Sequence, residues 1–228
     1  MHYLRLIKAH EMFYSAKGES RAPYYDEYMK CKDWNLWQGS VPLTEVMKLF
    51  GFVLSWDPHL EGDVAKFRAI YENIYPNLSQ LEQESIIDID LSDPKTVDVV
   101  NVVFDEVAHC PRSTRYESTD ASKILQTLLP QLFVMWDDKI KVRTLGPKVR
   151  TFGRNAGKPT RYDGIDYAQR FLPLMQQEAR DALDTFVEAN GGDRLQAEAE
   201  ISRSTGGKSL AKLIDEFNYT SYTLGMSV

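Results

Sequence analysis

The chain has 228 residues, of which 43% are hydrophobic and 26% are charged, and it carries a formal net charge of −6. This composition is ordinary for a folded protein and excludes a predominantly disordered chain. No apolar run reaches the length of about 18 residues that marks a membrane-spanning helix, and two cysteines are too few for the four thiolates of an iron–sulfur cluster.

The two cysteines, Cys31 and Cys110, form no CxxC pair and no disulfide framework, and the N-terminus lacks the apolar stretch of a signal peptide. Both features predict a cytoplasmic protein. No linker, internal repeat or low-complexity segment interrupts the sequence. We therefore expect residues 1–228 to form a single domain, with residues 1–115 and 116–228 as its lobes if it is divided.

Helical periodicity dominates the first half of the chain, although residues 1–62 mix aromatic residues with Gly and Pro and indicate only short helices. Residues 63–75 show the apolar spacing of a helix, which Pro76 is expected to stop. A further helix is expected over residues 78–89. Pro94, preceded by Ser92 and Asp93 as possible caps, predicts another helix start, with a strand as the alternative because the segment is rich in valine.

Helices are also expected throughout the second half. Thr119 or Asp120 is expected to cap a helix from Ala121 to about Leu129, which Pro130 ends. The remaining expectations are a loop or hairpin rich in Gly and Pro over 146–164, a helix over 165–189 with a kink or break at Pro173, helices over 195–203 and 209–217, and an aromatic tail that packs back onto the body. The sequence thus predicts a mainly α fold.

One segment, residues 120–142, contains a lysine followed by an aspartate that are candidate functional residues. Lys123 precedes a buried face by one position, about 100° around the helix, so its amine can lie at the edge of the core. Asp137 follows the apolar run Leu132 to Trp136 and is well placed to cap the next helix. The helix dipole and the free N–H groups at that position favour an ionised carboxylate.

These residues resemble the helix-hairpin-helix DNA glycosylases, among them the 8-oxoguanine glycosylases and endonuclease III. Those enzymes carry a lysine on one helix and an aspartate that opens the next helix after a short apolar run. Residues 121–124 (ASKI) are similar to the lysine part, and residues 133–137 (FVMWD) to the aspartate part. Uncharacterised bacterial proteins of the 8-oxoguanine glycosylase fold share the order ASK, P-x-x-F and aromatic-Asp, which implies a DNA glycosylase-like helical fold.

Two departures separate the chain from that family. The Gly-rich hairpin expected before the lysine, which holds a DNA phosphate, is replaced by residues 116–119 (YEST). The spacing of 14 residues from Lys123 to Asp137 is also a few residues shorter than in the better-known members. The resemblance therefore implies that the chain is a divergent member of this family that binds DNA without the hairpin.

The implied activity is excision of a damaged or modified base from DNA. Lys123 would be the nucleophile that attacks the sugar, and Asp137 would stabilise positive charge on the sugar. The resulting Schiff base would permit lyase activity, and neither a metal nor an organic cofactor is required. The base must leave the stack to reach such a site.

A basic tract directly follows Asp137. Between residues 139 and 162 there are eight cations and no acid, on a chain that is otherwise acidic, so we expect this tract to bind DNA phosphates. Trp136 or Tyr162 could stack on a base. The predicted DNA-binding residues are Trp136, Lys139, Lys141, Arg143, Lys148, Arg150, Arg154, Lys158 and Arg161.

Structural interpretations of the same residues remain open. Lys123 could be a solvated lysine, Asp137 a helix cap only, Trp136 a core residue and the basic tract a solvated loop. The alternative function is therefore a non-catalytic module of the same fold that binds nucleic acid or protein, with a role in phage defence as a further expectation.

Overall fold

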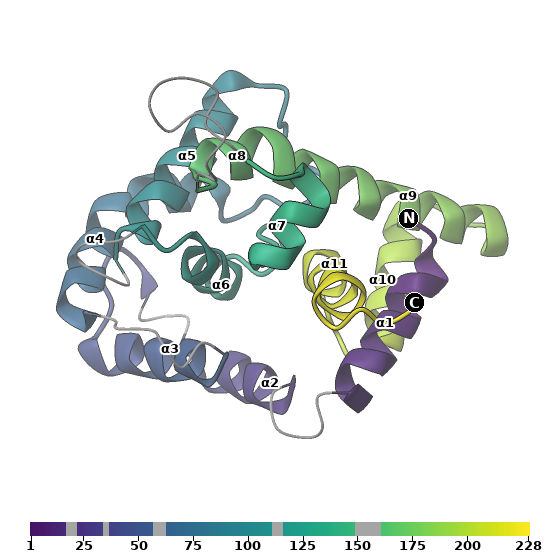
Figure 1. Cartoon of the computed structure of the whole chain (residues 1–228), viewed down its shortest axis with the longest axis horizontal. Helices are drawn as coiled ribbons and strands as arrows, with labels where there is room; N and C mark the ends of the chain where they lie inside the picture. The colour runs from purple at the N-terminus through teal and green to yellow at the C-terminus, as the bar shows by residue number, and fades with distance from the viewer. Residues whose placement is uncertain (17–21, 34–36, 57–62, 111–115, 149–160) are drawn as a thin grey trace.

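The computed structural model describes residues 1–16, 22–33, 37–56, 63–110, 116–148 and 161–228. Within these ranges every regular element is helical (Figure 1). The mainly α fold predicted from the sequence is therefore confirmed at this level. None of the helices in these ranges has both the length and the apolar character needed to cross a membrane.

Six helices lie within the described ranges up to Leu128. The last five pack in series, with α2 on α3, α3 on α4, α4 on α5 and α5 on α6. Their bounds are α1 (Tyr3–Ala16), α2 (Ala22–Cys31), α3 (Leu43–Trp56), α4 (Val64–Leu81), α5 (Pro94–Ala108) and α6 (Ser118–Leu128).

The elements after Leu128 start with the short helix α7 and end with the π-helical turn η4. The elements are α7 (Asp138–Leu145), α8 (Gly164–Asp166), η3 (Tyr167–Phe171), α9 (Leu172–Asn190), α10 (Arg194–Ser204), α11 (Leu210–Asn218) and η4 (Tyr219–Thr223). Figure 1 shows α6 and α11 nearly end-on in the middle of the molecule, with α7 close to α11.

The N-terminal helix belongs with the C-terminal helices in space. α1 packs against α9 and α11, and Figure 1 shows both chain ends on that side of the molecule. Tyr219 in η4 contacts Phe13 in α1 at 5.8 Å between ring centroids, so the aromatic tail packs back as predicted. Buried side chains from Leu6 to Phe217 form one continuous hydrophobic core.

The predicted start of α5 is confirmed, because a side chain caps this helix. Asp93 accepts a hydrogen bond from the Lys95 backbone N–H, and Pro94 opens α5, so this segment is a helix and the strand alternative is wrong. Asp63 caps α4 in the same way, through the Lys66 backbone N–H. These contacts lie within one helical turn and depend on no distant residue.

Other boundaries differ from the sequence prediction. α4 continues through Pro76 to Leu81, because Pro76 is exposed while the later residues Leu78 and Leu81 are buried in the core. Residues 82–93 then form turns, so the helix expected over residues 78–89 is wrong. α6 begins at Ser118, earlier than predicted, and neither Thr119 nor Asp120 is its cap.

The helix expected over residues 165–189 forms as one continuous run of α8, η3 and α9, because the backbone at their junctions stays in the right-handed helical region. Asp163 caps its start, and the π-helical η3 ends just before Pro173. The missing backbone donor of Pro173 is thus accommodated by a local distortion, and the helix is not broken there. Gly191 ends α9 with a φ of 79°, a conformation that favours glycine.

A non-helical apolar segment, residues 131–137, crosses the core between α6 and α7. Its side chains from Leu132 to Trp136 are all buried, so its backbone groups need partners other than water. The Tyr167 hydroxyl accepts from the Val134 N–H at 2.9 Å and donates to the Val134 carbonyl at 2.8 Å. The Ser122 hydroxyl accepts from the Trp136 N–H at 3.1 Å.

Tyr167→Phe should destabilise the protein strongly. The substitution leaves the Val134 N–H and carbonyl buried without their partner, and each orphaned group costs about 1–3 kcal/mol. We expect the free energy of unfolding, measured with urea, to fall by about 2–4 kcal/mol. The control Tyr24→Phe, at a residue that is 50% exposed, should change it by less than about 0.5 kcal/mol. Equal effects of the two substitutions would contradict this account of the segment.

Candidate functional site

Lys123 lies on α6 at the margin of the core. Its side chain is 12% exposed, and its ammonium is 3.4 Å from the Asp120 carboxylate one turn earlier. The neighbouring residues Ser122 and Ile124 are fully buried. The predicted position at the edge of the buried face is thus observed, with the amine held beside an acid of its own helix.

Asp137 caps α7, as its position in the sequence predicts. One carboxylate oxygen accepts the Ile140 backbone N–H at 2.8 Å. The other accepts the hydroxyl of Thr223, which lies in η4. The carboxylate is therefore fixed both by its own helix and by the C-terminal tail.

The junction between α6 and α7 joins the residues that precede the two groups. Ser122 and Trp136, which immediately precede Lys123 and Asp137, are joined by the hydrogen bond from the Trp136 N–H to the Ser122 hydroxyl. The Lys123 ammonium itself contacts Asp120, and the Asp137 carboxylate contacts Ile140 and Thr223. The backbone of both residues is therefore positioned by one junction, while each side chain has its own partners.

Lys141 is a buried link between α6 and α7, which corrects its assignment as a phosphate contact. Its ammonium donates to the Thr119 hydroxyl at 2.7 Å and to the Asp138 carboxylate at 3.1 Å, and lies over the Trp136 ring. Burial lowers its pKa, against the attraction of Asp138. The side chain is 3% exposed, so phosphates have little access to it.

Trp136 is a core residue, which corrects its assignment to DNA binding. The indole is 1% exposed and packs against Phe104, Tyr167 and Phe171. Its N–H donates to the Ser118 carbonyl at 2.9 Å. A ring enclosed on all these sides has no free face for a base.

The remaining cations of the basic tract differ in their surroundings. Lys148 is neutralised by Asp163 and Asp166, which follow the acid-free stretch in sequence. Three exposed cations have no carboxylate partner among the described residues, namely Lys139, Arg143 and Arg161. The predicted residues Arg150, Arg154 and Lys158 lie outside the described part of the chain.

The exposed cations line two hollows on either side of α7. Lys139 and Arg143 line one, of about 900 Å³, together with Arg5 and the tail residue Tyr222. Arg161 lines the other, of about 520 Å³, beside the start of α6. Neither Lys123 nor Asp137 lines these hollows, although Asp138, next to Asp137, lines both. The cations thus flank the α6–α7 junction on two sides.

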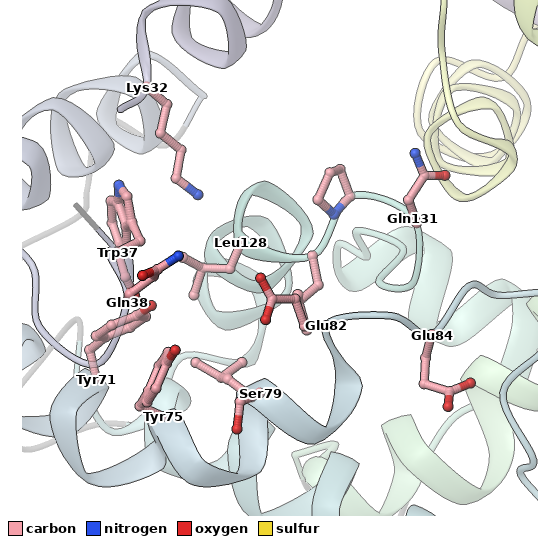
Figure 2. Close-up of a pocket in the computed structure, with 13 residues that line it drawn as sticks. Lys32, Trp37, Gln38, Tyr71, Tyr75, Ser79, Glu82, Glu84, Leu128 and Gln131 are labelled. Carbon is pink, nitrogen blue, oxygen red and sulfur yellow. Dashed lines mark hydrogen bonds between the residues drawn. The ribbon is translucent and has the colours of Figure 1, made fainter. Parts of the chain in front are cut away.

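A third cavity, of about 400 Å³, lies at the other end of α6 and was not predicted from the sequence. Figure 2 shows its aromatic wall of Trp37, Tyr71 and Tyr75, with the Lys32 amine and the Glu82 carboxylate turned toward the same space beside Leu128. Lys32 and Trp37 lie in the first 62 residues, where no apolar period indicates which side chains face inward. The cavity forms where residues that follow α2 meet α4 and the end of α6.

The amine of Lys32 is nearly removed from water. The residue is 4% exposed, its nitrogen donates to the Thr127 carbonyl at 3.1 Å, and it lies 4.4 Å from the Trp37 ring centroid. Burial lowers the pKa of Lys32 to about 6, against the opposing attraction of Glu45. At neutral pH this lysine is therefore mostly uncharged.

Comparison of the chain with known protein families, with curated proteins and with solved structures gives no match. Within the described residues, no three His, Cys, Asp or Glu side chains gather into a group that could hold a metal ion. The functional proposals below therefore rest on the side chains and their geometry.

The burial of Lys32 should make stability depend on pH. The folded pKa of about 6 lies below the ordinary value of 10.5, so between these values the unfolded chain binds a proton that the folded chain lacks. The free energy of unfolding then rises with pH, by up to about 1.4 kcal/mol per pH unit. Lys32→Met should remove this contribution and stabilise the protein at neutral pH.

Urea unfolding at several pH values above about 6 measures this slope. Lys30→Met is the matched control, because Lys30 lies two residues earlier, in the last turn of α2, and is exposed. Its slope should equal that of the wild type. If Lys32→Met also keeps the wild-type slope, then Lys32 is charged in the folded protein and the account above is wrong.

Proposed function

We propose that this protein is a DNA glycosylase that excises a damaged or modified base, with Lys123 as nucleophile and Asp137 as the group that stabilises the sugar cation. The observation that carries the proposal is the junction of α6 and α7. There the hydrogen bond between Ser122 and Trp136 joins the residues before Lys123 and Asp137, the Asp137 carboxylate is fixed by two donors, and exposed cations line the hollows beside α7.

The chemistry requires negative charge near the sugar as the bond from C1′ to the base breaks. Asp137 supplies a carboxylate whose orientation is fixed by the Ile140 N–H and the Thr223 hydroxyl. A preorganised charge of this kind lowers the barrier because no solvent or side chain has to reorient during the reaction.

The lysine has to lose a proton before it can attack. Asp120, 3.4 Å from the Lys123 nitrogen, is placed to accept this proton. The neutral amine forms a bond to C1′ while the base departs with the bonding electrons and takes up a proton. Opening of the sugar ring converts the adduct into a Schiff base, from which β-elimination cleaves the strand.

A second candidate is a non-catalytic module that binds nucleic acid. It is favoured by the engagement of Lys123 with Asp120 and by the absence of both Lys123 and Asp137 from the hollows that flank α7. In this function, Arg143 and Arg161 would bind phosphates and the α6–α7 junction would be structural only. The two candidates differ in whether a base is released.

Borohydride trapping distinguishes the two functions. Duplexes that carry oxidised, alkylated, deaminated or phage-type modified bases are incubated with the protein and borohydride, and covalent adducts are resolved on denaturing gels. We expect one modified base to give an adduct with the wild type and none with Lys123→Gln. The exposed control Lys95→Gln should trap as the wild type does.

Asp137→Asn removes the negative charge of this residue but keeps a side-chain oxygen that can cap α7. Asn caps a helix as well as Asp does, so stability should change little, whereas loss of the charge should slow excision by about 10²–10³-fold. Abasic-site formation and urea unfolding measure the two effects. If no modified base yields an adduct or an abasic site, the glycosylase proposal is wrong.

The salt dependence of DNA binding tests the cationic hollows in both candidate functions. Arg143→Ala and Arg161→Ala should each weaken binding to a short duplex. Each should also reduce the slope of log K against log salt by about one, because one phosphate contact is lost. Arg194→Ala is the control, since the Arg194 guanidinium already pairs with Asp184 at 2.7 Å. Slopes that do not differ from the wild type would exclude these residues from the interface.

A further inference from the structure

The cavity beside Lys32 has the features of a ligand site. Its volume of about 400 Å³ lies in the range of small-molecule pockets, about 300–1,000 Å³. Most of its wall is apolar or aromatic, and a few polar groups converge on it (Figure 2). Lys123 and Asp137 do not line it, so the cavity is separate from the α6–α7 junction.

Lys32 is the nucleophilic group of this cavity. Its nitrogen donates a hydrogen to the Thr127 carbonyl near the end of α6 and lies 4.4 Å from the centroid of the Trp37 ring, which lines the same cavity. The negative end of the α6 dipole and Glu45 both favour the charged amine, yet burial prevails and holds its pKa at about 6. A lysine desolvated in an apolar pocket is an activated nucleophile at neutral pH.

We propose that this cavity is a carbonyl-binding site, in which the Lys32 amine forms an imine with a small aldehyde or ketone. The apolar part of the ligand would pack against Tyr75, Leu78 and Leu128. Its carbonyl carbon would meet the Lys32 nitrogen near the Trp37 ring.

The reaction needs no oxidant, reductant or metal. The Lys32 lone pair forms a bond to the carbonyl carbon while the C=O π electrons move to oxygen. A proton then moves from nitrogen to oxygen, which gives a carbinolamine. Loss of the hydroxyl group with one further proton releases water and leaves the C=N bond. Glu82, whose carboxylate lines the same cavity, can carry these protons.

Reductive trapping with benzaldehyde tests the site, because this probe combines an aldehyde with an apolar ring. The full-length protein is treated at neutral pH with limiting benzaldehyde and cyanoborohydride, and modified lysines are mapped by peptide mass spectrometry. At this pH an ordinary exposed lysine is almost entirely protonated. We therefore expect Lys32 to react at least about tenfold faster than Lys30, which is exposed in the last turn of α2.

Two variants distinguish the cavity from the amine. Ser79→Trp keeps Lys32 but places a large side chain at the cavity from an exposed position on α4, and it should suppress the labelling of Lys32. Lys30→Met should leave that labelling unchanged. Circular dichroism verifies that both variants are folded, and the N-terminal amine, paired with Asp181 at 2.9 Å, is mapped separately.

The outcomes are independent of the glycosylase proposal, since no DNA is involved. Preferential modification of Lys32 in the wild type, lost in Ser79→Trp, supports the site. Modification of Lys32 at the same rate as Lys30 would overturn it. Fast modification that persists in Ser79→Trp would also overturn it, because the aldehyde would then reach the amine by another route.

Discussion

The fold depends on the way in which the apolar segment over residues 131–137 crosses the core without being a helix. Its side chains supply hydrophobic free energy, but its buried backbone groups require partners, and an unpaired group would cost more than most single contacts provide. Tyr167 pairs with both backbone groups of Val134, and Ser122 pairs with the Trp136 N–H. Burial raises the pKa of the Tyr167 phenol, which keeps this hydroxyl protonated and able to donate.

The candidate catalytic pair inherits its geometry from this segment. The hydrogen bond between Ser122 and Trp136 joins the residues that precede Lys123 and Asp137, so it positions the backbone of both candidate residues. The tail adds a constraint from a remote part of the chain, because Thr223 donates to Asp137 from 86 residues away. The Lys141 ammonium of α7 also donates a hydrogen bond to the Thr119 hydroxyl of α6, which links the two helices. A site assembled in this way is sensitive to packing throughout the C-terminal helices.

Three buried lysines show how neighbours decide the state of one residue type. Burial alone would lower the pKa of Lys212, but Asp215 and Glu216 raise it, so this lysine remains an ammonium. Lys141 has a single carboxylate partner, Asp138, and burial still lowers its pKa. Lys32 has the opposing charge of Glu45 and a carbonyl contact, and burial dominates. The same side chain therefore serves as an internal ion pair, a link between helices and a reactive amine.

The sequence by itself determined the mainly α fold and the local features that depend on one helical turn, such as the caps Asp93 and Asp137. A cap needs only a short polar side chain and the N–H groups two or three residues ahead, so its signal is complete in the sequence. Tertiary structure decided the continuation of α4 past Pro76, the burial of Trp136 and Lys141, and the cavity around Lys32. These depend on which distant surfaces meet, because desolvation is set by residues far away in the chain.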